Sequence, residues 1–349
     1  MELLRKLQAE ARELLPEAYF DYYAGGAGDE QTLAENEIAW RKLWIRPRLM
    51  VDVSGVDPSC TLLGERLAVP ILLAPMAGQR LLHAEGECAA ARAAGDAGTV
   101  YCLSTRATTD LAEVAACARG PVWFQLYVGG DREHCGRVLA RVAEHGFRAV
   151  VLTIDLPVAG RRERELRHGD YPLPDGVALA SHLGHDLAGD TKPLGGWDTT
   201  LTWPDVAWVR EACGLPVLVK GVLTAEDAGA ALHAGADGIV VSNHGARQLD
   251  GCVPSAVALP EVTAAVQGRV PVLVDGGIRD GGDVLRALAL GADAVLVGRP
   301  YGWGLATGGE AGVRAVVEAF ADDLRRAMAL AGCPTLDQIG PDRVRRAGW

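Results

Sequence analysis

The feature that most constrains the fold is a regular alternation of short apolar runs with alanine-rich stretches, beginning at Val69. The apolar runs have the length and β-branched content of strands buried on both faces, and the stretches between them are typical of helices. The expected strands are 69–74, 99–103, 121–126, 148–154, 216–220, 236–242, 270–274 and 292–297. The expected helices are 84–97, 109–118, 131–145, 203–213, 224–234, 256–267, 280–290 and 309–331. Eight strand–helix units predict a closed parallel (β/α)8 barrel, the TIM barrel.

The remaining segments are expected to extend this barrel within a single domain that spans the whole chain. Its parts are an N-terminal helical cap segment (1–66), the barrel (67–331), an insertion after the fourth strand (156–202) and a C-terminal tail (332–349). The cap segment begins with two helical stretches, and its mixed part, 28–66, is expected to close the bottom of the core. Irregular loops as long as the insertion are usually functional lids or partly disordered.

Composition excludes several classes of function. The 349 residues carry a formal net charge of −11, which argues against nucleic acid or an anionic membrane as the main partner. No apolar run approaches the ~20 residues that span a bilayer, and the N-terminus lacks the apolar core of a signal peptide. None of the eight cysteines lies in a CxxC pair, so we expect reduced thiols in a cytoplasmic protein. No motif that binds a metal is recognised, and no metal is expected.

Polar or titratable residues follow nearly every expected strand. In barrels of this type the active site lies at the C-terminal ends of the strands. The residues at these ends include Pro75, Met76, Ala77, Ser104, Arg106, Gln125, Tyr127, Thr153, Asp155, Lys220, Ser242, His244, Asp275 and Arg299. Stability alone does not explain such a set in one register, so a functional site is expected at this end.

The sixth strand ends in a polar corner that contains His244 and Arg247. Histidine is the side chain best suited to take a proton near neutral pH, and arginine binds a carboxylate through two parallel hydrogen bonds. Together they suggest a substrate that loses a proton next to a carboxylate. For an isolated pair, a buried core histidine and a surface arginine would be the commoner explanation. The polar ends of the other strands favour the catalytic interpretation.

Two glycine-rich turns predict a phosphate site. They are Asp275-Gly276-Gly277-Ile278-Arg279 and Gly298-Arg299, which follow the seventh and eighth strands. Glycines allow backbone N–H groups to approach a phosphate, and these two loops are the usual phosphate site of the barrel. Lys220 could form a Schiff base with a phosphosugar or could stabilise negative charge on a cofactor ring. The neutral donors and acceptors Gln125, Thr153 and Ser242 suit a flat heterocycle better than a sugar.

The run Ser242–Asp250 resembles the signature of the FMN-dependent L-2-hydroxyacid oxidases and dehydrogenases. Further motifs match the family in the same order along essentially the whole chain. They are Asp21-Tyr22-Tyr23, Gln125-Leu126-Tyr127, Thr153-Ile154-Asp155, Gly160-Arg161-Arg162, Val219-Lys220-Gly221, Asp275-Gly276-Gly277 and Gly298-Arg299. Several independent motifs make this resemblance far more specific than a single glycine-rich motif.

The resemblance implies FMN at the mouth of the barrel and assigns a role to each site residue. The flavin ring and ribityl contacts would be Pro75, Met76, Ala77, Ser104, Gln125, Thr153, Lys220 and Ser242. The rest of FMN, mainly its phosphate, would lie on Asp275, Gly276, Gly277, Arg279, Gly298 and Arg299. His244 would take the substrate proton, and Asp155 would pair with the imidazolium that forms. The substrate would be held by Tyr22, Arg162 and Arg247 at its carboxylate and by Tyr127 at its oxygen.

Two departures from glycolate oxidase concern the substrate pocket. Where that enzyme has a Trp after Leu-Ser-Ser, this chain has Leu103-Ser104-Thr105-Arg106, and its Thr-Ala-Met becomes Met76-Ala77-Gly78. The loss of bulk predicts a larger pocket and an aryl substrate such as mandelate or 4-hydroxymandelate. Arg106 could instead select a polar or anionic tail. The alternatives are a lactate, glycolate or medium-chain 2-hydroxy acid.

The sequence also indicates which molecule accepts the electrons and which other classes of function compete with this one. No haem domain precedes the barrel, and the insertion has no long apolar face, which favours an oxidase that reduces O2 to H2O2 over a dehydrogenase with another acceptor. The family analogy suggests a homotetramer. A metal-free aldolase or isomerase using Lys220, or a flavin-barrel remnant acting as a scaffold, would be the other classes. A base such as His244 beside two arginines speaks against a scaffold.

Overall fold

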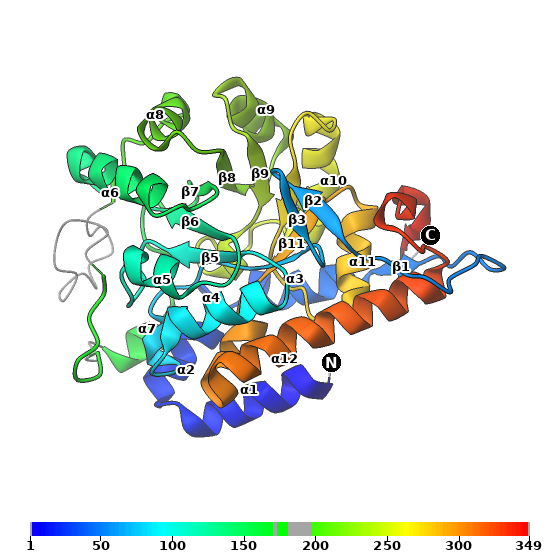
Figure 1. The fold of residues 1–349 in the computed structure, drawn as a ribbon, viewed down its shortest axis with the longest axis horizontal. Coiled ribbons are helices and arrows are strands. Elements are labelled where there is room, and N and C mark those ends of the chain that lie inside the picture. The colour runs from blue at the N-terminus through cyan, green and yellow to red at the C-terminus, as the bar shows by residue number, and fades with distance from the viewer. Residues whose placement is uncertain (1, 170–172, 181–196, 348–349) are drawn as a thin grey trace.

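The computed structural model describes residues 2–169, 173–180 and 197–347. Its centre is a closed barrel of parallel strands in the order β10-β11-β4-β5-β6-β7-β8-β9 (Figure 1). These strands are β4 (Ile71–Leu73), β5 (Tyr101–Ser104), β6 (Val122–Leu126), β7 (Val150–Thr153), β8 (Val217–Val222), β9 (Gly238–Val241), β10 (Val272–Val274) and β11 (Ala294–Val297). Almost every strand residue is buried, which explains why the strands read as continuous apolar runs. The predicted (β/α)8 barrel is confirmed.

Helices surround the barrel in the predicted order. They are α4 (Gly86–Asp96), α5 (Leu111–Cys117), α6 (Arg132–Glu144), α8 (Pro204–Cys213), α9 (Ala225–His233), α10 (Ser255–Val266), α11 (Gly281–Ala289) and α12 (Arg299–Ala331). The α12 span contains a kink at Gly308 and Gly309, where φ/ψ leave the helical region, and the predicted helix 309–331 corresponds to the part after it. The part that begins at Arg299 was not predicted, because its glycines hide the helical pattern. One of them is needed for packing, since a Cβ on Gly304 would lie 2.5 Å from the carbonyl oxygen of Gly312.

The bottom of the barrel is closed by a short hairpin. Strands β2 (Cys60–Leu62) and β3 (Glu65–Leu67) pair antiparallel. Their buried residues Leu62 and Leu67 join the apolar cluster inside the barrel, which includes Leu72 and Trp123. The burial of this apolar surface fixes the hairpin at the N-terminal ends of the strands.

Helix α3 (Gln31–Arg41) lies at the opposite end, so the prediction that 28–66 closes the bottom is right for the hairpin and wrong for this helix. Its buried Asn36 exchanges side-chain hydrogen bonds of 2.9 and 2.8 Å with Asn243, directly after β9. Trp40 Nε1 also donates to the carbonyl oxygen of Gly276 at 2.8 Å. Buried polar groups must be paired, and the partners of Asn36 and Trp40 lie at the C-terminal end of the barrel.

The two ends of the chain pack outside the barrel. Helices α1 (Glu2–Leu14) and α2 (Glu17–Ala24) lie beside α12 (Figure 1). Strand β12 (Val344–Arg346) pairs antiparallel with β1 (Leu43–Ile45). The remaining elements are α7 (Glu163–His168) and the 3-10 turns η1 (Gln79–Leu81), η2 (His244–Ala246), η3 (Leu336–Gln338) and η4 (Pro341–Arg343). The predicted insertion contains α7, and its residues 170–172 and 181–196 lie outside the described residues. Within the described ranges, no helix combines the length and apolar character of a transmembrane span.

One pair of cysteines departs from the expectation of reduced thiols. Cys88 of α4 and Cys117 of α5 form a disulfide across a Cα–Cα distance of 5.9 Å. The expectation was wrong for this pair because the packing of two neighbouring helices, not the sequence spacing, brings the sulfurs together. The thiols of Cys60, Cys102, Cys135, Cys213, Cys252 and Cys333 are free.

Candidate active site

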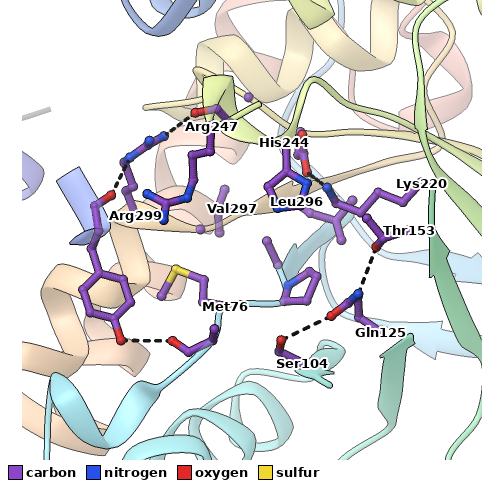
Figure 2. Close-up of a pocket in the computed structure, with 18 of the residues that line it drawn as sticks. Met76, Ser104, Gln125, Thr153, Lys220, His244, Arg247, Leu296, Val297 and Arg299 are labelled. Atoms are coloured by element: carbon purple, nitrogen blue, oxygen red, sulfur yellow. Dashed lines mark hydrogen bonds and ion pairs between the residues drawn. The ribbon is translucent and has the colours of Figure 1, made fainter. Parts of the chain in front are cut away.

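A cavity at the C-terminal ends of the strands gathers the predicted site residues (Figure 2). About 1070 Å³ of space there is free of protein atoms. The predicted residues in its lining are Tyr22, Pro75, Met76, Ala77, Ser104, Arg106, Gln125, Tyr127, Thr153, Arg162, Lys220, His244, Arg247, Asp275, Gly276, Gly277, Arg279, Gly298 and Arg299. Asp155 and Ser242 lie behind this wall, where they contact His244 and Lys220. The structure therefore brings the whole predicted set to one place.

Neutral polar side chains form a chain of hydrogen bonds along one wall of the cavity (Figure 2). Ser104 Oγ bonds to Gln125 Oε1 at 3.2 Å, and Gln125 Nε2 donates to Thr153 Oγ1 at 3.1 Å. These residues come from the neighbouring strands β5, β6 and β7, and all are buried. Mutual pairing fixes which way the amide of Gln125 points, so the wall offers an ordered set of donors and acceptors to a flat ligand.

Lys220 sits beside this wall as a buried cation. Its Nζ lies 3.2 Å from Asp275 Oδ2 and donates to Ser242 Oγ at 2.8 Å. Burial alone would lower the pKa of Lys220, but the carboxylates of Asp275 and Asp155 outweigh it and the pKa is raised. The amine therefore stays protonated, which opposes the Schiff-base chemistry of an aldolase because that reaction needs a neutral amine. Asp275 Oδ1 is buried and has no hydrogen-bond partner among the described residues.

His244 stands between an anion and a phenol. Its Nδ1 lies 2.8 Å from Asp155 Oδ1, and its Nε2 lies 3.1 Å from Tyr127 Oη. Burial lowers the pKa of His244 and raises that of Tyr127 to about 12. Burial also acts to raise the pKa of Asp155, but His244 and Lys220 outweigh it, so its pKa is lowered. An ionised Asp155 holds the proton on Nδ1 and leaves the Nε2 lone pair at the cavity, the arrangement of a general base.

The backbone that presents His244 is strained. His244, Gly245 and Ala246 have φ values of 59°, 61° and 64°, in the left-handed region. A non-glycine residue there costs on the order of 1–3 kcal/mol unless its surroundings fix it. Ser242 Oγ accepts from the N–H of His244 at 3.0 Å, and Asn243 Oδ1 accepts from that of Ala246 at 3.1 Å. The corner is thus held in a shape that points the imidazole into the cavity.

Arg299 is a partly buried cation without a carboxylate partner among the described residues. Its guanidinium donates to the carbonyl oxygens of Tyr23 at 2.9 Å, Gly25 at 2.8 Å and Gly245 at 3.1 Å. Burial, together with the charges of Arg247 and Arg279, lowers its pKa to about 9. It is also the first residue of α12, where the helix dipole favours an anion. This corner fits a phosphate group.

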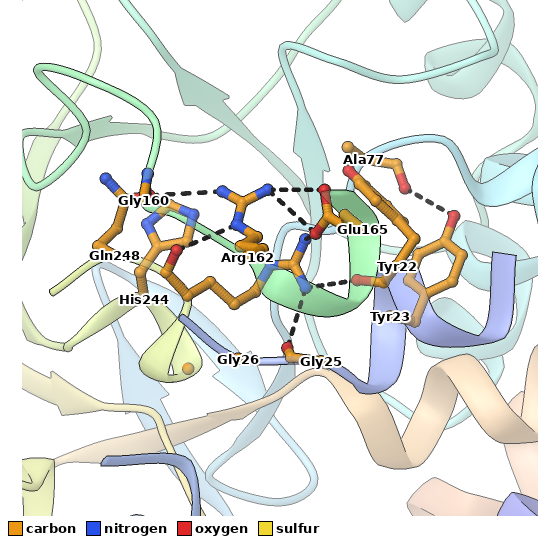
Figure 3. Close-up of polar contacts among 12 residues, drawn as sticks. Tyr22, Tyr23, Gly25, Gly26, Ala77, Gly160, Arg162, Glu165, His244 and Gln248 are labelled. Atoms are coloured by element: carbon orange, nitrogen blue, oxygen red, sulfur yellow. Dashed lines mark hydrogen bonds and ion pairs between the residues drawn. The ribbon is translucent and has the colours of Figure 1, made fainter. Parts of the chain in front are cut away.

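Arg162 and Arg247 come together, as predicted, but they already share a carboxylate (Figure 3). Glu165 Oε1 lies 3.3 Å from Arg162 Nη1 and 3.0 Å from Arg247 Nη2. The guanidinium of Arg247 also lies over the ring of Tyr22, 4.9 Å from its centroid. The sequence analysis missed Glu165 because it follows the mixed-charge run 161–164 and resembles an ordinary exposed helix charge.

An indole that the sequence analysis also missed packs against two residues that line the cavity, Tyr127 and Arg106. Trp197, at the end of the insertion, lies with its ring centroid 4.8 Å from that of Tyr127. The guanidinium of Arg106 lies 5.9 Å from the centroid of the same indole. The indole therefore packs against two residues of the cavity wall from a distant segment of the chain.

The chain is similar to known proteins over nearly its whole length. Residues 11–346 match the family described as FMN-dependent dehydrogenase. Glycolate oxidase of Spinacia oleracea is 44% identical over 355 residues, covering 99% of this chain and 96% of that protein. L-lactate oxidase of Nostoc sp. is 45% identical over 343 residues, covering 94% of each chain. A crystal structure of mandelate oxidase superposes with a TM-score of 0.92 at 45% identity, covering 98% of this chain and 97% of that one.

Proposed function

Since the chain belongs to the FMN-dependent dehydrogenase family, we propose that it oxidises an (S)-2-hydroxy acid to the 2-oxo acid and reduces O2 to H2O2. One observation carries the proposal. The imidazole of His244, held by Asp155 and deprotonated at neutral pH, lines the same cavity as the guanidiniums of Arg162 and Arg247. A base beside a carboxylate-binding pair is what a 2-hydroxy acid requires.

Two features of the cavity support FMN as the group that it holds. Among the described residues, Asp275 Oδ1 is a buried acceptor without a donor, and the partly buried cation of Arg299 at a helix N-terminus has no carboxylate partner. The flavin ring would contact the Ser104–Gln125–Thr153 wall, Lys220 and the loop Pro75, Met76 and Ala77, with Ser242 holding Lys220 from behind. The phosphate end would lie on Arg299 with Gly276, Gly277, Arg279 and Gly298. When bound, FMN accepts two electrons from the substrate and passes them to O2. The charge of Lys220 would favour negative charge on the ring edge that it touches.

In this proposal each residue around the substrate has one task. Arg162 and Arg247 bind the carboxylate, with Tyr22 beneath Arg247. Tyr127 Oη donates a hydrogen bond to the substrate oxygen, and its raised pKa keeps it protonated. His244 Nε2 takes a proton from the substrate, and the carboxylate of Asp155, 2.8 Å from Nδ1, stabilises the imidazolium. The acid loses two electrons and two protons in all, and O2 takes up both pairs to give H2O2.

For the substrate side chain we propose an aryl group, as in mandelate or 4-hydroxymandelate. The rings of Tyr127 and Tyr22 line the cavity, the indole of Trp197 packs against Tyr127, and aromatic rings favour one another as neighbours. The structural similarity to mandelate oxidase, including a complex with (S)-4-hydroxymandelic acid at a TM-score of 0.91 and 44% identity, supports this choice. The comparable identity to glycolate oxidase and L-lactate oxidase supports the smaller acids as the second candidate.

The test is a comparison of kcat/KM for mandelate, 4-hydroxymandelate, lactate and glycolate in air, with H2O2 and 2-oxo acid measured together. We expect one H2O2 per 2-oxo acid. We also expect an aryl preference of on the order of tenfold or more, the scale of a few apolar contacts in a pocket. A preference for glycolate would overturn the aryl assignment. Rapid dye reduction without peroxide would make the protein a dehydrogenase.

The pH dependence of kcat/KM tests the role of His244. Because burial lowers its pKa below the ordinary value of 6.5, the unprotonated base persists to lower pH than a free histidine would. We therefore expect the acidic limb of kcat/KM, along which His244 takes up a proton, to be centred below pH 6.5. An acidic limb centred above pH 6.5 would contradict the assignment of this histidine as the base.

A further inference from the structure

Glu165 occupies the place that a bound carboxylate would take. It bridges the two guanidiniums at 3.3 Å and 3.0 Å, and its side chain is 19% exposed (Figure 3). The side chains of Arg162 and Arg247 are each only 16% exposed. Two cations this close repel each other, and burial together with the charge of Arg247 lowers the pKa of Arg162. Glu165 relieves that repulsion in the protein without substrate.

We propose that Glu165 is a specificity-determining residue that competes with the substrate carboxylate for Arg162 and Arg247. The inference rests on the proposed function in one respect, the use of these two arginines to bind the substrate. It adds that the binding pair is neutralised by a carboxylate of the chain itself, which the substrate must displace.

The other hydrogen bonds of the two arginines support displacement rather than sharing. Arg162 Nε donates to the carbonyl oxygen of Arg247 at 3.0 Å, and Arg247 Nη1 donates to that of Gly25 at 3.2 Å and to that of Tyr22. These bonds go to backbone atoms and hold the side chains in position, and Arg162 Nη2 also donates to the side chain of Gln248, at 3.4 Å from Oε1. Glu165 is the charged partner that can rotate away. A second carboxylate beside it would meet like-charge repulsion in a partly buried site.

The helix that carries Glu165 is anchored independently of it. His168 Nε2 lies 2.8 Å from Asp21 Oδ2, and Arg164 pairs with Glu30, so α7 is attached to α2 and to the segment after it. The carboxylate of Glu165 can therefore leave the guanidiniums by side-chain rotation while α7 stays in place. When the 2-oxo acid departs, Glu165 returns to the same guanidiniums, which favours product release.

The test uses the FMN-loaded protein and ligands that cannot be oxidised. Phenylacetate and propionate carry the carboxylate, and phenylacetamide and propionamide are their neutral counterparts; binding is followed by calorimetry. Glu165→Gln removes the charge and keeps the shape, so the dissociation constants of both carboxylates should fall on the order of tenfold. Those of the amides should not change. Glu163→Gln is the matched control, because the Glu163 side chain lies on the same helix, is 47% exposed and pairs with Arg161. This variant should change the dissociation constants of neither the carboxylates nor the amides.

Two results would overturn the proposal. One is weaker or unchanged carboxylate binding in Glu165→Gln, which would make Glu165 a support that orders the arginines. The other comes from a crystal structure of the unmodified protein with phenylacetate, which does not depend on how the variant folds. Glu165 should have left both guanidiniums there, and retention of both contacts would refute displacement. Failure of the proposed function would look different: no 2-hydroxy acid would bleach the flavin, while the titrations would still report on Glu165.

Discussion

Replacing His244 with Gln is expected to lower kcat for 2-hydroxy acid oxidation by about 10³–10⁴-fold, the effect of losing a positioned general base. Glutamine can accept a hydrogen bond from Tyr127 but cannot take up the substrate proton. The proposed FMN contacts do not include His244, so the variant should keep its flavin. Anaerobic flavin bleaching after rapid mixing with substrate measures the rate, and the absorption spectrum before mixing measures the flavin content.

His233→Gln is the matched control for this prediction. His233 is an exposed residue in the last turn of α9, away from the cavity, and its replacement should leave kcat unchanged. If His244→Gln bleached its flavin within about tenfold of the unmodified rate, less than a positioned base contributes, another group would have to be the base.

Replacing Lys220 with Met is expected to lower the free energy of unfolding by about 3–5 kcal/mol, because it leaves the buried carboxylate of Asp275 without its cation. The loss arises from Asp275, one of whose oxygens already lacks a partner among the described residues. Removing the charge of both residues in Lys220→Met with Asp275→Leu should therefore restore part of the stability. Urea unfolding of the FMN-free proteins measures all three, since bound FMN would add to the apparent stability by an amount that depends on its contact with Lys220.

Lys42→Met provides the comparison. The Lys42 side chain is 62% exposed and pairs with Glu35 at 3.2 Å, a surface ion pair of the kind that contributes about 0–1 kcal/mol. A Lys220→Met variant as stable as Lys42→Met would mean that Asp275 is not held as a buried anion by Lys220.

The barrel could be predicted from the sequence because its signals are local. Each strand is a short run buried on both faces, so the apolar pattern of β6 or β9 is visible without knowledge of its neighbours. In a closed barrel with parallel strands, the residues that end the strands must meet at one rim. From this geometric rule alone, the sequence predicts that Lys220 and His244 line the same cavity.

The position of α3 and the disulfide were predicted wrongly for the same reason, which is that the residues that interact there are distant in the sequence. The position of α3 depends on the pairing of Asn36 with Asn243, and nothing near either residue indicates the other. The disulfide likewise joins cysteines 29 residues apart in helices that become neighbours only after folding.

The sequence by itself determined the fold class and the chemical groups of the site, because strand periodicity and the residue types at strand ends are local properties of the chain. Only the tertiary structure decided which residues compensate the charges of those groups and which rings pack against them. It brought Glu165 onto the guanidiniums of Arg162 and Arg247, and it packed Trp197 against Tyr127. Charge compensation and ring packing depend on distances of a few ångströms between segments far apart in sequence, and those distances exist only in the folded chain.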